Sequence, residues 1–312
     1  MDWVREMMGA DSAVRGERIQ SLWSGYGEIL RVQLTGAPVE SVVVKDVRPP
    51  SAKGLGRGEL RSHERKLRSY EVETHWYEQW SARCDERCRV PRCLGTRREK
   101  GRWQFVLEDL DASGFPGRGR DLSDRRMRLC LRWLAAFHAT FLGERPRGLW
   151  KVGTYWHLAT RPDELEAMDD GALQWAAPLI DRRLSEARFR TLVHGDAKPA
   201  NFCFSTGNDA VAGVDFQYVG GGCGMKDVAY LLGHEESERR VKGLLDHYFV
   251  TLRKELGRRG TDVDPKAVEA EWRSLYPFAW ADHHRFLSGW APSWSAPVRG
   301  RALTRQVIRS LE

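Results

Sequence analysis

The segment from residue 190 to 216 constrains this chain most, because it places three short polar side chains beside short strands. The runs RTLVHGD, NFCFS and AVAGVDF are rich in apolar, β-branched and aromatic residues, and TGND between the last two is a turn sequence. Asp196 follows His194-Gly195 after the first strand, Asn201 lies five positions later, and Asp215 ends the return strand. We expect these three side chains to meet at one edge of a hairpin.

Phosphoryl transfer requires a set of side chains of this kind. One carboxylate orients an attacking hydroxyl and accepts its proton, and two oxygen ligands hold Mg²⁺ on the nucleotide phosphates. A single aspartate has a simpler explanation as a turn former or a helix cap. The combination of Asp196, Asn201 and Asp215 therefore favours a phosphoryl-transfer site.

The first third of the chain predicts an antiparallel meander. Turn sequences, SGYG and TGAP, separate three short strand-like runs, which are RIQSLW, EILRVQL and SVVVKDV. Residues 51–68 are rich in Gly and basic residues and lack apolar periodicity, so we expect an exposed loop that enters a helix.

Helical patterns follow this meander. A helix is expected over about 67–80, where Tyr70, Tyr77 and Trp80 share a face, and a second begins at the N-cap Ser123 and stops before Gly143. The run RWQFVLEDL between them predicts a strand, and the sequence after residue 216 is mainly helical. This order of elements predicts an α+β protein of two lobes.

Composition limits the function classes. The chain has 312 residues, 41% of them hydrophobic, and a net charge of +7, which suits an anionic partner such as a nucleotide or merely a solvated basic surface. No apolar run reaches the roughly 18 residues of a membrane span, and the start lacks the apolar core of a signal peptide. We expect a cytoplasmic protein without a membrane partner. The cluster of Cys84, Cys88 and Cys93 matches no zinc signature, so we expect free thiols there and no metal.

The motifs HGDAKPAN and VDFQ resemble those of the family of aminoglycoside phosphotransferases, choline kinases and ecdysteroid kinase-like proteins, and are most similar to the ecdysteroid kinase-like branch. The resemblance extends over roughly 19–232. It implies an α+β, two-lobed protein kinase-like fold, with a small antiparallel-sheet N-terminal lobe and a larger, mainly helical C-terminal lobe. The implied division is a nucleotide-binding lobe at 1–106, a hinge at 107–111 and a catalytic and acceptor-binding lobe at 112–312.

The same resemblance implies roles in the C-terminal lobe. Asp196 would be the catalytic base, and Asn201 and Asp215 would hold Mg²⁺ on ATP. Lys198 departs from the histidine usual in aminoglycoside phosphotransferases and resembles the lysine of protein kinase catalytic loops, where it would neutralise charge on the transferred group. Asp227, in GMKDVAY, would brace the loop or cap the next helix, a structural role.

In the N-terminal lobe, Lys45 ends the run Val42–Val44 and would grip the α- and β-phosphates. Glu73 is the implied ion-pair partner of Lys45, with Glu71 as the competing choice. The glycines of SGYG would let backbone N–H groups approach the phosphates, although a tight hairpin turn needs the same Gly25 and Gly27. By the same resemblance, the backbone of FVLEDL would bind the adenine edge, through Glu108, Asp109 and Leu110.

One further segment, WKVGTYWHLATRPDEL, is unusual because Tyr155, Trp156, His157 and Arg161 crowd together. These residues either line an acceptor pocket or fill the core of the lobe.

The function these observations favour is transfer of the ATP γ-phosphoryl group to a hydroxyl of a small organic molecule. The alternatives are a non-catalytic nucleotide-binding pseudokinase and an aminoglycoside- or choline-type kinase. A nucleic-acid partner rests on net charge alone, so none is expected. The oligomeric state stays open.

Charge also bears on the acceptor. From Ala112 onward 30 Lys and Arg stand against 25 Asp and Glu, so this half is near +5. We therefore expect a neutral or anionic hydroxyl compound in preference to an aminoglycoside, unless a local acidic cluster such as RPDELEAMDD reverses the balance.

Overall fold

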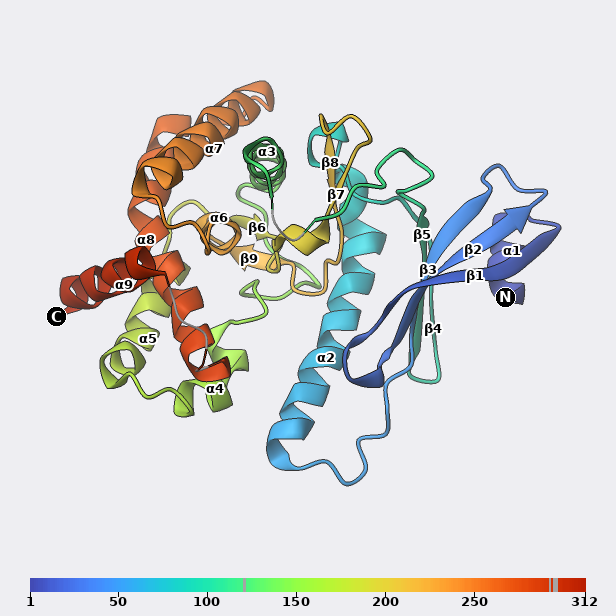
Figure 1. Cartoon of the computed structure of the whole chain (residues 1–312), viewed down its shortest axis with the longest axis horizontal. Coiled ribbons are helices and arrows are strands. Elements are labelled where there is room, and N and C mark those ends of the chain that lie inside the picture. Colours follow the sequence, from blue (N-terminus) through green and yellow to red (C-terminus); the bar gives the residue numbers. More distant parts are fainter. Residues whose placement is uncertain (120–121, 292, 294–296) are drawn as a thin grey trace.

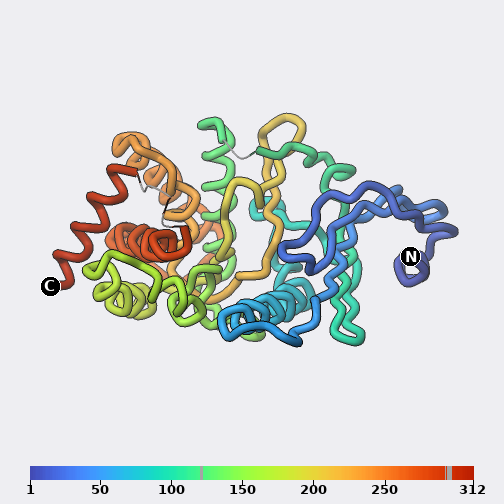
Figure 2. Tube along the Cα trace, turned by 60° about the horizontal axis from the view of Figure 1, so that its bottom comes forward, coloured from blue at the N-terminus to red at the C-terminus, as the bar shows by residue number. Residues whose placement is uncertain are grey.

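The computed structural model describes residues 1–119, 122–291, 293 and 297–312. It is an α+β structure with an antiparallel sheet at one end, a helical lobe at the other and α2 between them (Figure 1). The two termini lie at opposite ends of the molecule in both views (Figure 2). The strands are β1 Ser12–Ser21, β2 Gly27–Thr35, β3 Ser41–Val47, β4 Cys93–Glu99, β5 Arg102–Glu108, β6 Thr191–Val193, β7 Phe202–Phe204, β8 Val211–Gly213 and β9 Gly220–Gly222.

The helices follow the same division, with two of them before the last strand of the sheet and the others in the second lobe. Short 3₁₀ turns at Trp23–Gly25, Leu158–Thr160 and Pro199–Asn201 connect several elements, and the π-helical turn Trp76–Trp80 continues α2. The α-helices are α1 Asp2–Met8, α2 Arg57–His75, α3 Asp124–Thr140, α4 Pro162–Glu166, α5 Gly171–Ser185, α6 Met225–Leu231, α7 Glu238–Arg258, α8 Pro265–Trp290 and α9 Val298–Leu311.

The two faces of the sheet pack against different helices. The strand order is β1-β2-β3-β5-β4, with every neighbouring pair antiparallel. Val42 and Val44 of β3 join Val4 of α1 in one apolar cluster, whereas Val47 joins the aromatic core around α2. Because side chains alternate along a strand, Lys45 shares the face of Val47 and points toward α2.

Several boundaries differ from the sequence-based expectation. The first strand begins at Ser12 rather than in RIQSLW, and α2 begins at Arg57, so two-thirds of the segment 51–68 is helical. The first turns of α2 are mostly exposed or half-buried, and so carry little apolar periodicity. Strand β4 was not predicted, since CLGTRRE is a charged edge strand; charges of this kind protect sheet edges from pairing.

The helical lobe is built around α3 and α8. The prediction for α3 is confirmed: the Ser123 hydroxyl accepts a hydrogen bond from the Arg126 N–H, and the apolar stripe that includes Leu134 and Phe137 is buried. Helix α3 packs along α7, and α8 contacts α4, α5, α6, α7 and α9. In the described part of the chain, none of the helices is both long and apolar enough to span a membrane.

The predicted single hairpin is two separate strand pairs. Strand β6 pairs with β9, and β7 pairs with β8. Asn201 and Asp215 thus flank the β7–β8 pair, while Asp196 follows a different pair. The run GGG of β9 has no side chains, so hydrophobic alternation could not reveal it.

Candidate active site

Lys45 joins the sheet to α2 and to the helical lobe. Its Nζ lies 2.8 Å from Glu73 Oε2 and 3.4 Å from Asp215 Oδ1. Burial alone would lower the pKa of Lys45, but the carboxylates of Glu73 and Asp215 outweigh it and raise the pKa. Glu71, the competing choice, is half-exposed and binds Arg68 and Arg98 instead.

The backbone of residues 194–201, which we call the Asp196 loop, is held by buried polar side chains. The fully buried Asp227 carboxylate accepts the N–H groups of His194 and Gly195, at 2.6 and 2.9 Å. His138 also lies 3.1 Å from this carboxylate. These bonds agree with the structural role expected of Asp227.

His194 links the Asp196 loop to the strand that precedes Asp215. Its Nδ1 accepts the Asp196 N–H at 3.2 Å, and its Nε2 lies 3.0 Å from the Val214 carbonyl oxygen. Since Nδ1 is an acceptor, Nε2 carries the proton and donates to Val214. The sequence analysis noted His194 only as part of the motif HGDAKPAN, and its bridging role was not predicted.

Three side chains converge on the Asp196 carboxylate. Its Oδ2 accepts from Lys198 Nζ at 2.7 Å and from Asn201 Nδ2 at 3.1 Å, and its Oδ1 accepts from the Tyr230 hydroxyl at 3.3 Å. Burial raises the pKa of Asp196 and the nearby Asp215 adds to the rise, although Lys198 opposes it. Tyr230, one turn along α6 from Asp227, carried no sequence signal for this contact.

Asn201 and Asp215 are the candidate Mg²⁺ ligands. Val214 N–H donates to the Asn201 carbonyl at 3.0 Å, which sets the two residues side by side. The amide nitrogen of Asn201 is committed to Asp196, so its amide oxygen is the atom left to bind a cation. Asp215 has a φ of 69°, its side chain is 34% exposed, and Lys45 and Lys198 overcome the effect of burial and lower its pKa. A hard-oxygen pair of this type suits Mg²⁺.

The two glycines of SGYG have different local requirements. A Cβ on Gly27 (φ 128°) would lie 2.0 Å from the Asp46 carbonyl oxygen, so strand packing alone demands glycine there. Gly25 (φ 74°) faces open space, and its backbone angle alone favours glycine. The loop rests on α2, because Lys66 Nζ donates to the Ser24 hydroxyl at 2.8 Å.

The candidate hinge is fixed by its side chains. Glu108 pairs with Arg89 at 2.6 Å, and Asp109 pairs with Arg31 at 2.7 Å. The Asp109 and Leu110 carbonyls accept the N–H groups of Ser113 and Phe115, at 3.0 and 2.8 Å. Within the described residues, no hydrogen bond is assigned to the Leu110 N–H.

The aromatic residues of WKVGTYWHLATRPDEL lie in different surroundings, some in the core of the lobe and others beside the candidate site. Trp156 is fully buried and donates to Asp282, so it fills the core. The Tyr155 N–H donates to the Gly195 carbonyl at 3.1 Å, and its ring centroid lies 5.7 Å from that of Tyr230. Tyr155 therefore lies against the Asp196 loop.

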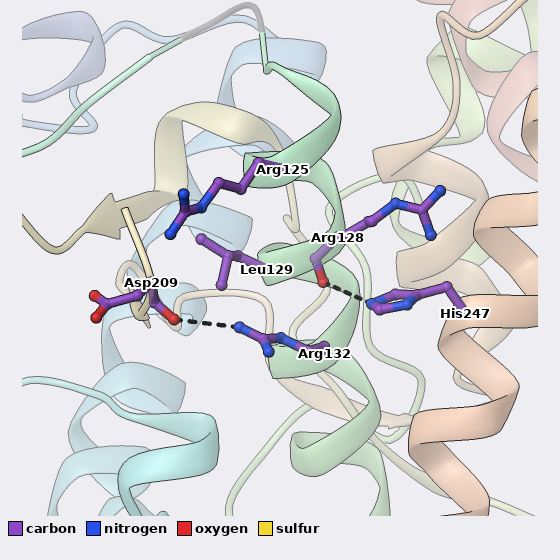
Figure 3. A pocket seen from close by; sticks show the side chains of 6 residues that line it. All are labelled: Arg125, Arg128, Leu129, Arg132, Asp209 and His247. Carbon is purple, nitrogen blue, oxygen red and sulfur yellow. Dashed lines mark hydrogen bonds between the residues drawn. The ribbon is translucent and has the colours of Figure 1, made fainter. Parts of the chain in front are cut away.

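A groove of about 340 Å³ lies outside this site, between α3, α7 and the β7–β8 turn (Figure 3). The Arg132 guanidinium donates to the Asp209 carbonyl at 3.2 Å, and His247 lies 3.3 Å from the Arg128 carbonyl (Figure 3). The arginine side chains there tie α3 to the turn of the hairpin that presents Asn201 and Asp215. We assign this groove a supporting role.

The cysteines do not contribute to the site. All six are free thiols. Among the described residues, no three or more His, Cys, Asp or Glu side chains gather as a metal-binding group.

Comparison with solved structures shows the same architecture in small-molecule kinases. A microcompartment-associated aminopropanol kinase matches with a TM-score of 0.55 and 15% identity, over 99% of this chain and 94% of that chain. An ethanolamine kinase from Plasmodium vivax matches with a TM-score of 0.51 and 12% identity, over 96% and 84%.

An aminoglycoside phosphotransferase from Streptomyces rimosus, in complex with ADP and streptomycin, gives a TM-score of 0.50 and 15% identity over 89% and 96%. At these identities the likeness establishes a shared fold. A search of curated protein sequences gave no significant match. The model of the phosphotransferase enzyme family (APH) matches residues 20–260, and the chain therefore belongs to that family.

Proposed function

We propose that this protein is an Mg²⁺-dependent kinase that transfers the γ-phosphoryl group of ATP to a hydroxyl of a small organic molecule. The contacts of Lys45 carry the proposal, because this lysine of the sheet touches both Glu73 of α2 and Asp215 of the helical lobe. A phosphate-binding lysine and a metal ligand thus meet at one point, as phosphoryl transfer requires.

The charge of the site supports a cation. Two lysines, Lys45 and Lys198, face three carboxylates, those of Glu73, Asp196 and Asp215. This net negative charge favours a divalent cation, which Asp215 and the amide oxygen of Asn201 would hold. When bound, Mg²⁺ would neutralise charge on the nucleotide phosphates.

We assign the role of the base to Asp196, and its contacts with Lys198 and Asn201 support this. Its carboxylate accepts the proton of the acceptor hydroxyl as that oxygen bonds to the γ-phosphorus, and the bond to the bridging oxygen breaks to release ADP. The ammonium of Lys198 beside it offsets charge on the transferred group. Positioning and electrostatics then supply most of the rate enhancement.

The division of labour along the chain is part of the proposal. Residues 1–106 would hold the nucleotide with Lys45, the hinge 107–111 would meet adenine through the Leu110 N–H, and residues 112–312 would bind the acceptor. The assignment to the ecdysteroid kinase-like branch and the cytoplasmic location likewise stay proposals based on the sequence. A non-catalytic nucleotide-binding protein is the rival, and the presence of Lys45, Asp196, Asn201 and Asp215 argues against it.

Titration with ATP by calorimetry, with and without Mg²⁺, tests the nucleotide step. An ATP-consumption screen over alcohols, amino alcohols, sugars, hydroxy acids and aminoglycosides tests the transfer step. We expect Mg²⁺-dependent binding and consumption that depends on one acceptor class. Tight binding with no consumption in any mixture would favour the non-catalytic rival.

A further inference from the structure

The N-terminal half of α2 touches the segment that follows Tyr155. Arg61 pairs with Asp163 of α4, and Arg65 Nη1 donates to the Thr160 carbonyl at 3.1 Å. These contacts bring Arg65 next to the residue that follows Thr160, which is Arg161. The charge of Arg161 acts on Arg65, so the two guanidinium groups lie within electrostatic range of each other.

Arg161 is held firmly by its neighbours. It is 8% exposed, its Nε donates to the Tyr155 carbonyl at 2.7 Å, and its Nη1 pairs with Glu164 at 2.8 Å. Its guanidinium carbon also lies 5.0 Å from the ring centroid of Phe286. The side chain therefore has one defined orientation beside the Asp196 loop.

Arg65 is a cation without a counter-ion. Its two remaining nitrogens differ: Nη2 donates to the Ser62 hydroxyl, while Nε is buried and has no hydrogen-bond partner. It forms no ion pair with any described residue. Burial lowers its pKa, and the charge of Arg161 lowers it further, while Tyr218, which also hydrogen-bonds to Arg65, and Glu164 oppose this change. A partly buried guanidinium in this state costs stability unless an anion joins it.

A tyrosine connects these arginines to the proposed reaction centre. Burial raises the pKa of Tyr218; Arg161 and Arg65 counter that rise, and Asp196 and Asp215 add to it. The Tyr218 phenol is therefore within electrostatic range of both arginines and both carboxylates. Tyr155, whose carbonyl holds Arg161, lies 6.0 Å from Tyr218 between ring centroids.

We infer that Arg65 and Arg161 are the anion-binding part of the acceptor site, so that the acceptor carries a carboxylate or phosphate in addition to its reacting hydroxyl. This inference rests on the proposed function and narrows its substrate class. Guanidinium groups bind both anions through paired hydrogen bonds. A polycationic aminoglycoside or an amino alcohol would instead meet the charge of Arg65, which no close carboxylate balances, because Glu164 pairs with Arg161.

The test measures anion binding with the nucleotide site filled. Protein saturated with Mg·AMP-PNP is titrated with inorganic phosphate and, separately, with acetate. The variants are Arg65→Gln, Arg161→Lys and the control Arg68→Gln. Lysine is chosen at position 161 because it keeps the positive charge, whereas glutamine there could unfold the segment around Arg161. Arg68 lies three residues further along α2, and its side chain is 41% exposed and binds Glu71 and the Gly148 carbonyl.

We expect at least one of the two anions to bind the wild type and Arg68→Gln with equal affinity. The affinity of Arg65→Gln for that anion should be lower by about 10-fold or more, as loss of a charged hydrogen bond implies. Arg161→Lys should keep part of the affinity. Without anion, Arg65→Gln loses the bonds to Ser62 and Thr160 but also removes a cation that lies in no ion pair, so its stability should stay close to that of the wild type. A preference for phosphate indicates a phosphorylated acceptor, and a preference for acetate indicates a hydroxy acid.

Three outcomes oppose the inference in different ways. Absence of Mg·AMP-PNP binding would overturn the proposed function itself. Nucleotide binding without anion binding, or equal anion affinity in Arg65→Gln and wild type, would overturn only the acceptor assignment. Weaker nucleotide binding in Arg65→Gln, with its anion affinity unchanged, would assign the arginine to the ATP phosphates instead.

Discussion

The amide nitrogen of Asn201 donates to Oδ2 of Asp196 at 3.1 Å and to its carbonyl oxygen at 2.8 Å. One side chain thus orients the proposed base with its nitrogen and leaves its oxygen for a cation. The proposed base and the proposed metal site are therefore mechanically linked through Asn201.

Removal of Asp215 should make nucleotide binding insensitive to Mg²⁺. In Asp215→Ala, one of the two protein ligands is lost, so Mg·ATP should bind markedly more weakly while metal-free ATP binds about as before. Calorimetry with Mg²⁺ and with EDTA measures both affinities. Equal Mg·ATP affinity in the variant and the wild type would show that the metal assignment is wrong.

Glu73 and Glu71 provide a matched pair on one helix. Glu73→Gln removes the charge that fixes Lys45, and a misplaced phosphate-binding group lowers kcat/KM by about 10²-fold. Glu71→Gln changes only half-exposed contacts to Arg68 and Arg98, and should leave kcat/KM within about 2-fold, in line with the small contribution of surface pairs. If Glu71→Gln lowered kcat/KM more than Glu73→Gln in a steady-state assay, Glu71 would be the functional partner of Lys45.

The pH profile should report the environment of Asp196. Burial raises its pKa, so the acid limb of kcat/KM lies above the ordinary range of an aspartate, because the base must be unprotonated. Loss of the nearby cation in Lys198→Met should move this limb to still higher pH, and Lys198→Arg should largely restore it. If the acid limb stayed in place in Lys198→Met, Lys198 would have no influence on the pKa of the base.

The sequence named candidate residues but not how they meet. HGDAKPAN supplied Asp196 and Asn201, and the resemblance supplied Lys45; the structure brings these residues close to Asp215, and their chemical roles stay predictions. The partners that complete the site, Tyr230 and Arg65, lie on helices far along the chain, and their contacts arise only from packing. The pairing of β6, the strand before Asp196, was also missed, since its partner β9 is three glycines.

The glycine turn offers a stability test that is independent of activity. Gly27→Ala would place a Cβ against the Asp46 carbonyl and should destabilise the protein by more than about 2 kcal/mol, beyond the cost of a left-handed backbone alone. In Gly25→Ala the added Cβ meets open space, and the free energy of unfolding should fall by about 1–2 kcal/mol. Denaturant unfolding of both variants measures the difference. Equal losses would show that the close approach at Gly27 is relieved by backbone movement.

The most direct test of the account is the Asp196→Asn variant, which keeps the size of the side chain and removes the proton acceptor. A buried carboxyl with a raised pKa loses stability as pH rises through that pKa, so the variant should be at least as stable as the wild type at neutral pH. Calorimetry and an acceptor-dependent ATP-consumption assay are run on the same preparation. We predict that Asp196→Asn keeps the Mg·ATP affinity of the wild type, with turnover reduced by about 10²–10⁴-fold. Turnover close to that of the wild type would contradict the assignment of Asp196 as the base.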